Sequence, residues 1–158
     1  MLKFSRFAVI LVCLSMALPV LAAKKHDPKK TAIEARHAEM HLRAFNAGPL
    51  FAMARGKMPY DAKLAEKLAN NLAILLKVDN SRAWVKGTSH EEYPKLSTAL
   101  PKIWNTWPKI VDYGKDYAKA VKELDADAGK GRVALRHRVK ALGKACKACH
   151  DKFRKKEH

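Results

Sequence analysis

The sequence predicts an all-α protein, folded as an antiparallel four-helix bundle. Four segments carry apolar residues at alternating spacings of three and four, the repeat of one helix face. No segment sustains the strict alternation of apolar and polar residues that is typical of a strand. Most of the connections are short, and short connections between amphipathic helices favour antiparallel neighbours.

The first helix has one continuous apolar face. Its members are Ile33, His37, Met40, Ala44, Ala47 and Phe51. Gly48-Pro49 falls inside this face. Because proline lacks a backbone donor and clashes with the preceding turn, we expect a kink there or a break into two shorter helices.

The second helix follows a turn formed by Met58-Pro59-Tyr60-Asp61, and Asp61 is placed to cap its N-terminus. Its apolar face contains Leu64, Leu68, Asn71 and Leu75. We expect this helix to end near Lys77. A long polar connection follows from Asp79 to Leu96, and such a connection is either functional or a strap between antiparallel helices.

The third helix begins at Ser97-Thr98, with Pro101 in its first turn. Its predicted face contains Ile103, Trp107, Ile110, Gly114, Tyr117, Val121 and Leu124. Gly129-Lys130-Gly131 ends it and precedes a fourth helix. The face of the fourth helix contains Leu135, Val139, Leu142, Cys146, Cys149 and Phe153.

Residues 1–22 are predicted to be a secretory signal peptide. Lys3 and Arg6 form its charged start, an apolar stretch follows, and a small-residue cleavage site ends it. The stretch is shorter than the ~20 residues of a membrane span, and Pro19 closes it, so we expect no span in the mature chain. Residues 23–158 then form one exported, periplasmic domain.

The most specific motif is Cys146-Lys147-Ala148-Cys149-His150, a C-x-x-C-H sequence. Residues three apart on a helix share a face, so both thiols can reach the two vinyl groups of one haem. We therefore predict one covalently bound haem c, with His150 as an axial iron ligand. The alternative is a redox or disulfide pair, but such a site should open a helix after a strand, and no strand pattern precedes this one.

The ligand on the other side of the iron decides the function. Met40 is the leading candidate because it lies on the face of the first helix and a thioether binds haem iron well. Methionines at helical spacing also commonly fill a core, which is the alternative. His37 lies on the same face and allows bis-histidine ligation, whereas His41 is predicted to be turned away.

Three further residues are candidate haem contacts. Arg36 lies one residue off the face and is a candidate partner for a propionate, with a solvated surface arginine as the alternative. Trp104 and Trp107 are expected to surround the haem, unless they are ordinary core residues.

These features resemble the class II c-type cytochromes, the cytochrome c′ group, and most closely its low-spin branch, cytochrome c-556. The resemblance covers nearly the whole mature chain. It rests on the C-terminal haem motif, on Arg55-Gly56-Lys57-Met58-Pro59-Tyr60-Asp61, on Pro101-Lys102-Ile103-Trp104 and on Phe153-Arg154. Gly48-Pro49, inside a helix that the family keeps continuous, departs from the pattern.

The resemblance implies that Met40 binds the iron, as a methionine of the first helix does in the low-spin branch. We therefore expect an electron-transfer protein with a His150/Met40 haem. The alternative is a cytochrome c′ proper, whose open, five-coordinate iron takes nitric oxide or carbon monoxide. An enzyme is not expected, because His37 is the one residue placed for acid–base work and no arginine shares its face.

The chain is strongly basic, with a formal charge of +17. Loss of Lys3 and Arg6 with the signal peptide lowers this to +15. We therefore expect an acidic redox partner, contacted by Lys144, Lys147 and Lys152 around the haem motif. Nucleic acid is not expected, because the chain is exported and lacks an RNA-binding motif. The sequence leaves open whether the chain forms a homodimer.

Overall fold

The computed structural model describes residues 27–156, so the predicted signal peptide lies outside the described residues. The helices are α1 (Pro28–Arg55), α2 (Ala62–Leu75), α3 (Lys102–Asn105), α4 (Trp107–Asp127) and α5 (Arg132–Phe153), with a 3-10 turn η1 at Ser81–Ala83. Within this part of the chain there is no strand beyond one isolated bridge, Ala99 with Arg154. The predicted all-α fold is confirmed.

We predicted a kink or a break at Gly48-Pro49; helix α1 is continuous, so the break into two helices is wrong. Proline inside a helix costs about 3 kcal/mol. The next turn buries Leu50 and Met53 completely, and each such side chain contributes about 1.5–3 kcal/mol. Burial therefore offsets the proline, and the helix continues to Gly56, which caps it with a left-handed φ of 74°.

Helix α2 begins as predicted. The Asp61 side chain accepts a hydrogen bond from the Leu64 amide at 3.0 Å, which satisfies one free donor of the first turn. The helix ends at Leu75, close to the predicted Lys77. Its 14 residues span about 21 Å, against about 42 Å for the 28 residues of α1.

The predicted third helix is two helices, α3 and α4, and its prediction as one element is wrong. The chain leaves helical geometry at Thr106, where φ is −128° and ψ is 40°. Pro108 explains the break, because a proline lacks the amide that would bond to the preceding turn. It is well tolerated in the first turn of a new helix, and α4 begins one residue earlier at Trp107.

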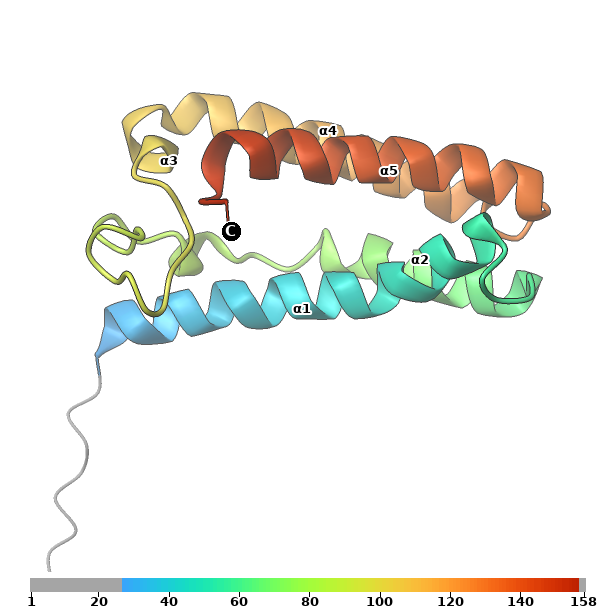
Figure 1. The fold of residues 1–158 in the computed structure, drawn as a ribbon, viewed down its shortest axis with the longest axis horizontal. Coiled ribbons are helices and arrows are strands. Elements are labelled where there is room, and N and C mark those ends of the chain that lie inside the picture. The colour runs from blue at the N-terminus through green and yellow to red at the C-terminus, as the bar shows by residue number, and fades with distance from the viewer. Residues whose placement is uncertain (1–26, 157–158) are drawn as a thin grey trace, which may run out of the picture.

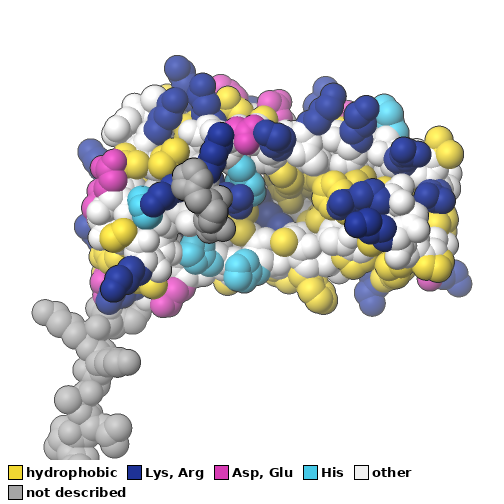
Figure 2. Space-filling model, in the orientation of Figure 1, with side chains coloured by type: hydrophobic (Ala, Val, Ile, Leu, Met, Phe, Trp, Pro, Cys, Tyr) yellow, Lys and Arg dark blue, Asp and Glu magenta, His cyan; other side chains and the backbone are white. Residues whose placement is uncertain are grey.

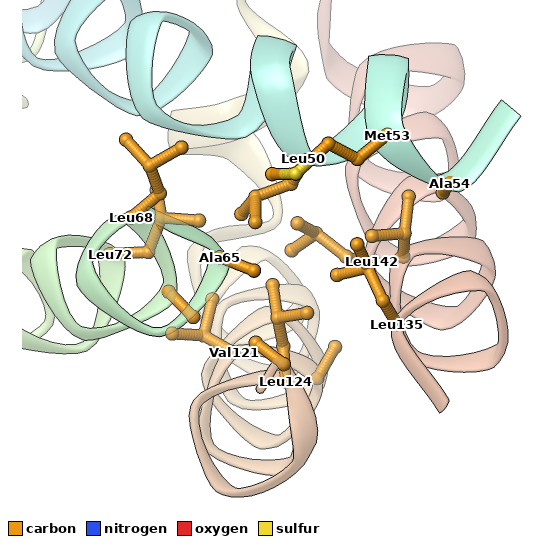
Figure 3. Packing of buried hydrophobic residues seen from close by; sticks show 14 residues of the cluster. Leu50, Met53, Ala54, Ala65, Leu68, Leu72, Val121, Leu124, Leu135 and Leu142 are labelled. Carbon is orange, nitrogen blue, oxygen red and sulfur yellow. The ribbon is translucent and has the colours of Figure 1, made fainter. Parts of the chain in front are cut away.

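The long helices form two layers. Figure 1 shows α4 and α5 side by side above α1 and α2, and α1 also packs on α5. The core lies in the half of the bundle that contains α2. Figure 3 shows its side chains meeting between the four helices, and they include Leu50, Met53, Leu68, Leu72, Val121, Leu124, Leu135 and Leu142.

The other half of the bundle lacks a fourth helix. Helix α2 stops at Leu75, and residues 76–101 run alongside the remaining helices as an irregular connection with η1 inside it. The packed side chains of the four helices therefore fill only the half of the bundle that contains α2. The candidate functional site lies in the other half. None of the described helices has the length and apolarity that a membrane crossing requires.

Candidate functional site

A cavity of about 920 Å³ occupies the half of the bundle that α2 does not reach. Residues of α1, α4, α5 and the connection line it. Figure 2 shows this face hollowed between the two helix layers, with apolar side chains deep in the hollow and basic side chains around it. The volume is at the upper end of the range typical of ligand and cofactor pockets.

The haem motif forms part of the wall of this cavity. Cys146, Cys149 and His150 all line it from the last turns of α5. Both cysteines are free and half-buried. Burial raises the pKa of both thiols, with a smaller opposing effect of Arg43 in each case, so they are held in the protonated form.

His150 is suited to bind a metal. Burial lowers the pKa of its imidazole, and the charge of Arg154 lowers it further. A lowered pKa favours the neutral ring, which is the form that donates an electron pair to iron. Two thiols and one neutral imidazole on a single wall of a largely apolar cavity are the donor set of a covalently held haem, so the residues present fit that group.

Helix α1 supplies another part of the wall. Met40 and His37 line the cavity, as the helical face predicted, and Met40 is half-buried. Burial, Arg36 and His41 lower the pKa of His37, in that order. His41 also lines the cavity, so its prediction as a residue turned away from the site is wrong. The cavity is therefore lined by three residues from adjoining turns of α1, which are His37, Met40 and His41.

The two predicted tryptophans have different positions. Trp107 lines the cavity with 41% of its surface exposed. Trp104 is not among the lining residues; its indole N–H donates to the Trp84 carbonyl at 2.9 Å. The short helix α3 therefore directs Trp104 into the connection, while the break before α4 leaves Trp107 at the cavity.

Arg36 is placed apart from the cavity and is buried, with 4% of its surface exposed. Its guanidinium donates to the Ala83 carbonyl and the Thr88 hydroxyl, each at 2.7 Å, and to the Thr88 carbonyl at 2.9 Å. It also lies near the rings of Trp84 and Trp104. Arg36 thus fastens the long connection to α1, which identifies the connection as a strap.

Several residues of the cavity wall escaped sequence reasoning, and Arg43 and Tyr117 are two of them. Arg43, on α1, lines the cavity and lies 4.7 Å from the centre of the Tyr117 ring on α4. Its position three residues after Met40 is the signal that could have found it, because residues three apart share a helix face. Tyr117 was predicted only as part of an apolar face; burial raises the pKa of its hydroxyl to about 12.

Comparison with known proteins gives consistent matches. The family model described as Cytochrome C′ matches residues 31–154. A cytochrome c′ from Cereibacter sphaeroides is 39% identical over 148 residues, which cover 94% of this chain and 97% of the relative. A cytochrome c-556 from Rhodopseudomonas palustris is 32% identical over 119 residues, which cover 68% of this chain and 72% of the relative.

Solved structures agree with the sequence matches. A cytochrome c′ from Rhodobacter sphaeroides superposes with a TM-score of 0.80 and 38% identity, covering 84% of this chain and all of that one. A ferrous variant of cytochrome c prime from Alcaligenes xylosoxidans, with bound NO, superposes with a TM-score of 0.70 and 25% identity, covering 82% of this chain and 97% of that one.

Proposed function

Since the chain belongs to the cytochrome c′ family, we propose that it is a periplasmic haem protein that binds nitric oxide or carbon monoxide. The observation that carries this proposal is the cavity of about 920 Å³, with both thiols and His150 on its α5 wall. The NO-bound relative supports a gaseous ligand. This is the alternative that the sequence left open.

Cys146 and Cys149 would hold one haem c through thioethers, and His150 would bind its iron. When bound, haem supplies an iron that binds diatomic ligands and changes its oxidation state. Phe51, Leu72 and Leu142 would exclude water, since all three line the cavity. In this proposal Met40 would form part of the cavity wall without binding the iron.

Electron transfer is the second candidate function, and one observation favours it. The Met40 side chain lines the same cavity as His150, so a His150/Met40 pair remains open to this chain. A six-coordinate iron of that kind changes oxidation state without an open position for a gas.

Optical spectra of the purified holoprotein separate the two functions. We expect high-spin ferric and ferrous spectra and ready binding of carbon monoxide by the ferrous protein. Met40→Leu should keep the same spin state, because a thioether that does not bind the iron can be replaced by a side chain of similar volume. Met53→Leu is the matched control, since Met53 is fully buried in the core and does not line the cavity.

The contrary result is equally clear. A low-spin wild type that binds carbon monoxide poorly, with a far-red sulfur-to-iron band that Met40→Leu removes and Met53→Leu keeps, would establish Met40 as the ligand and electron transfer as the function. A low-spin form that persists in Met40→Leu and is lost in His37→Ala would assign the ligand to His37 instead.

The proposal includes an acidic redox partner. A groove of about 560 Å³ between α1 and α5 is lined by Arg55, Arg132, Arg136 and Lys140, and none of its lining residues is acidic. Within the described residues, none of these four cations forms an ion pair. Phe51 lines both this groove and the cavity. The Phe51 side chain would therefore separate an acidic protein bound in the groove from the cavity.

A homodimer is also part of the proposal. Leu42 and Phe45 lie three residues apart on α1, so they share a face, and 47% and 75% of their surfaces are exposed. Exposed apolar pairs of this kind on a helix suit a contact with a second copy. Sedimentation of the wild type and of Phe45→Glu tests it, because a charge at this position should dissociate the dimer.

A further inference from the structure

The groove between α1 and α5 has an apolar floor and a cationic rim. The floor residues come from both helices and are Phe51, Ala54, Val139 and Gly143. A Cβ added to Gly143 would meet the Phe51 ring at 3.3 Å, so the two helices approach closely here. Figure 2 shows basic side chains gathered over apolar ones between the two layers, on the right of the view. A ligand for this groove therefore needs both an apolar part and negative charge.

Three of the rim cations lie in one row on α5. Arg132, Arg136 and Lys140 are each four residues apart, so they share a helix face, and all three are exposed. The row is about 12 Å long, because a helix rises ~1.5 Å per residue. None of the three forms an ion pair with a described residue. A row of this length matches carboxylates four residues apart on another helix, which lie about 5–6 Å from one another, better than it matches one compact anion.

Contacts within the chain already orient two of the rim arginines. Arg55 Nε donates to the Phe51 carbonyl at 3.2 Å, and its guanidinium carbon lies 5.4 Å from the centre of the Phe51 ring. The Arg132 guanidinium lies against Gly56, in the space that a Cβ there would fill. Side chains that are oriented before a partner arrives lose less conformational entropy on binding. The rim is therefore prepared to receive carboxylates.

We propose that this groove is the docking site of an amphipathic acidic helix of the partner protein. Carboxylates along one face of that helix pair with Arg132, Arg136 and Lys140, and an apolar side chain beside them contacts the Phe51 ring. The inference rests on the proposed function, because it specifies the acidic partner named there. A second copy of this chain does not suit the groove, since the formal charge of the chain is +17 and two copies repel each other.

The probe is a synthetic, alanine-rich peptide of about 18 residues, which is long enough to form a helix in water. It carries glutamate at every fourth position of one face, one leucine beside them on the same face, and a fluorophore at one end. Two control peptides differ in one feature each. The first has the same composition with its glutamates distributed around the helix, and the second has alanine in place of leucine. Fluorescence anisotropy at low salt measures the affinity of the holoprotein for each peptide.

Lys140→Ala and Lys144→Ala are the matched pair of protein variants. Both lysines are exposed on α5, and only Lys140 lines the groove. We expect Lys140→Ala and Arg136→Ala each to weaken binding of the first peptide about threefold or more, and Lys144→Ala to change it less than about twofold. Both control peptides should bind the wild type about threefold or more weakly than the probe, because one loses the charge pattern and the other the apolar contact.

Two results overturn the docking helix. One is an equal affinity for the probe and for the peptide with distributed glutamates, since charge alone then explains the attraction. The other is an equal loss in Lys140→Ala and Lys144→Ala, since the groove then has no special part in binding. Should either result occur while phosphatidylglycerol vesicles bind the wild type and bind Lys140→Ala more weakly, a lipid surface occupies the groove instead.

The failure of this inference differs from the failure of the proposed function. Carbon monoxide titration of the same holoprotein samples gives the distinction. Carbon monoxide binding together with equal peptide affinities overturns the docking helix and leaves the gas-binding function intact. A holoprotein that binds none of the peptides overturns both the docking helix and the acidic partner. Selective binding of the probe without carbon monoxide binding supports the docking helix and overturns the gas-binding function.

Discussion

The Tyr60 hydroxyl donates to the Ala128 carbonyl at 2.9 Å. Tyr60 belongs to the turn between α1 and α2, and Ala128 is the C-cap of α4. The same hydroxyl accepts from the Gly131 amide, also at 2.9 Å. One phenol thus joins two turns at the end of the bundle away from the cavity, and it satisfies two backbone groups that the helices leave free.

Tyr60→Phe should lower the free energy of unfolding by roughly 1–3 kcal/mol, because the carbonyl of fully buried Ala128 and the Gly131 amide lose their partner. Urea denaturation of the holoprotein measures the change. Tyr113→Phe is the control, since its hydroxyl makes no hydrogen bond to the described residues. Equal losses in both variants would contradict the role of the Tyr60 hydrogen bonds.

Gly48→Ala should raise the free energy of unfolding by about 1 kcal/mol. Gly48 lies inside α1, and a Cβ added there meets nothing within 4 Å. The same substitution at Gly131 should act in the opposite sense. Its φ is 107°, a conformation that strains any other residue by about 1–3 kcal/mol. Thermal unfolding of both variants checks the pair, and a destabilised Gly48→Ala would show that α1 needs freedom at this point.

The free energy of unfolding should decrease at acidic pH, because Asp127 becomes protonated there. Hydrogen bonds from Lys130 and Arg138 hold the pKa of this carboxyl below its usual range. A lowered folded-state pKa stabilises the protein above the unfolded pKa of about 4, and that stabilisation is lost as the pH falls through the folded value. Asp127→Asn should therefore destabilise the protein at pH 7 and match the wild type near pH 2.

The control for this series is Asp125→Asn, because Asp125 has no ion-pair partner in the described part of the chain. Chemical denaturation from pH 2 to pH 7 gives the comparison. A difference between Asp127→Asn and wild type that stays constant across the whole range would disprove the linkage.

Haem should remain with the polypeptide after acid-acetone extraction and denaturing electrophoresis. The Cys146→Ala, Cys149→Ala double variant should lose this attachment, and its helix content should fall, because the cavity of about 920 Å³ would be left unfilled. Circular dichroism and haem staining measure both. Haem that is extractable from the wild type, or a Cys146–Cys149 disulfide in a colourless protein, would remove the basis of the proposed site.

Electron exchange with an acidic protein acceptor should depend on the groove cations. Arg136→Glu should slow the reaction more than Lys147→Glu, because Lys147 is already paired with Asp151. The rate should also fall with added salt, as the Debye length decreases from ~30 Å at 0.01 M to ~10 Å at 0.1 M.

Stopped-flow measurements across that salt range provide the comparison, with the exposed Lys119→Glu as a charge-matched control on α4. A larger effect of Lys147→Glu would move the docking surface to the haem motif, as the sequence predicted. Rates that are insensitive to salt and to every reversal would exclude an acidic partner.

Local sequence signals were sufficient for the helices whose ends carry a cap. Asp61 caps α2 and Gly129-Lys130-Gly131 separates α4 from α5, as the residues alone predicted. The break at Thr106 was not predicted, because the apolar residues keep their spacing of three and four on both sides of Pro108. The backbone nevertheless leaves helical geometry there. The continuity of α1 through Pro49 was decided by burial of Leu50 and Met53, a tertiary effect.

By itself the sequence predicted the covalent chemistry proposed for the site, since C-x-x-C-H requires only that two thiols and an imidazole share a helix end. Tertiary structure decided what surrounds them. The early end of α2 opens the cavity, and the packing of α1 against α4 and α5 brings Arg43 beside Tyr117. The Arg36 guanidinium hydrogen-bonds to carbonyl and hydroxyl oxygens of the strap that lie 47 to 61 residues away in the sequence. Helical periodicity could not predict these acceptors, because it describes only one helix at a time.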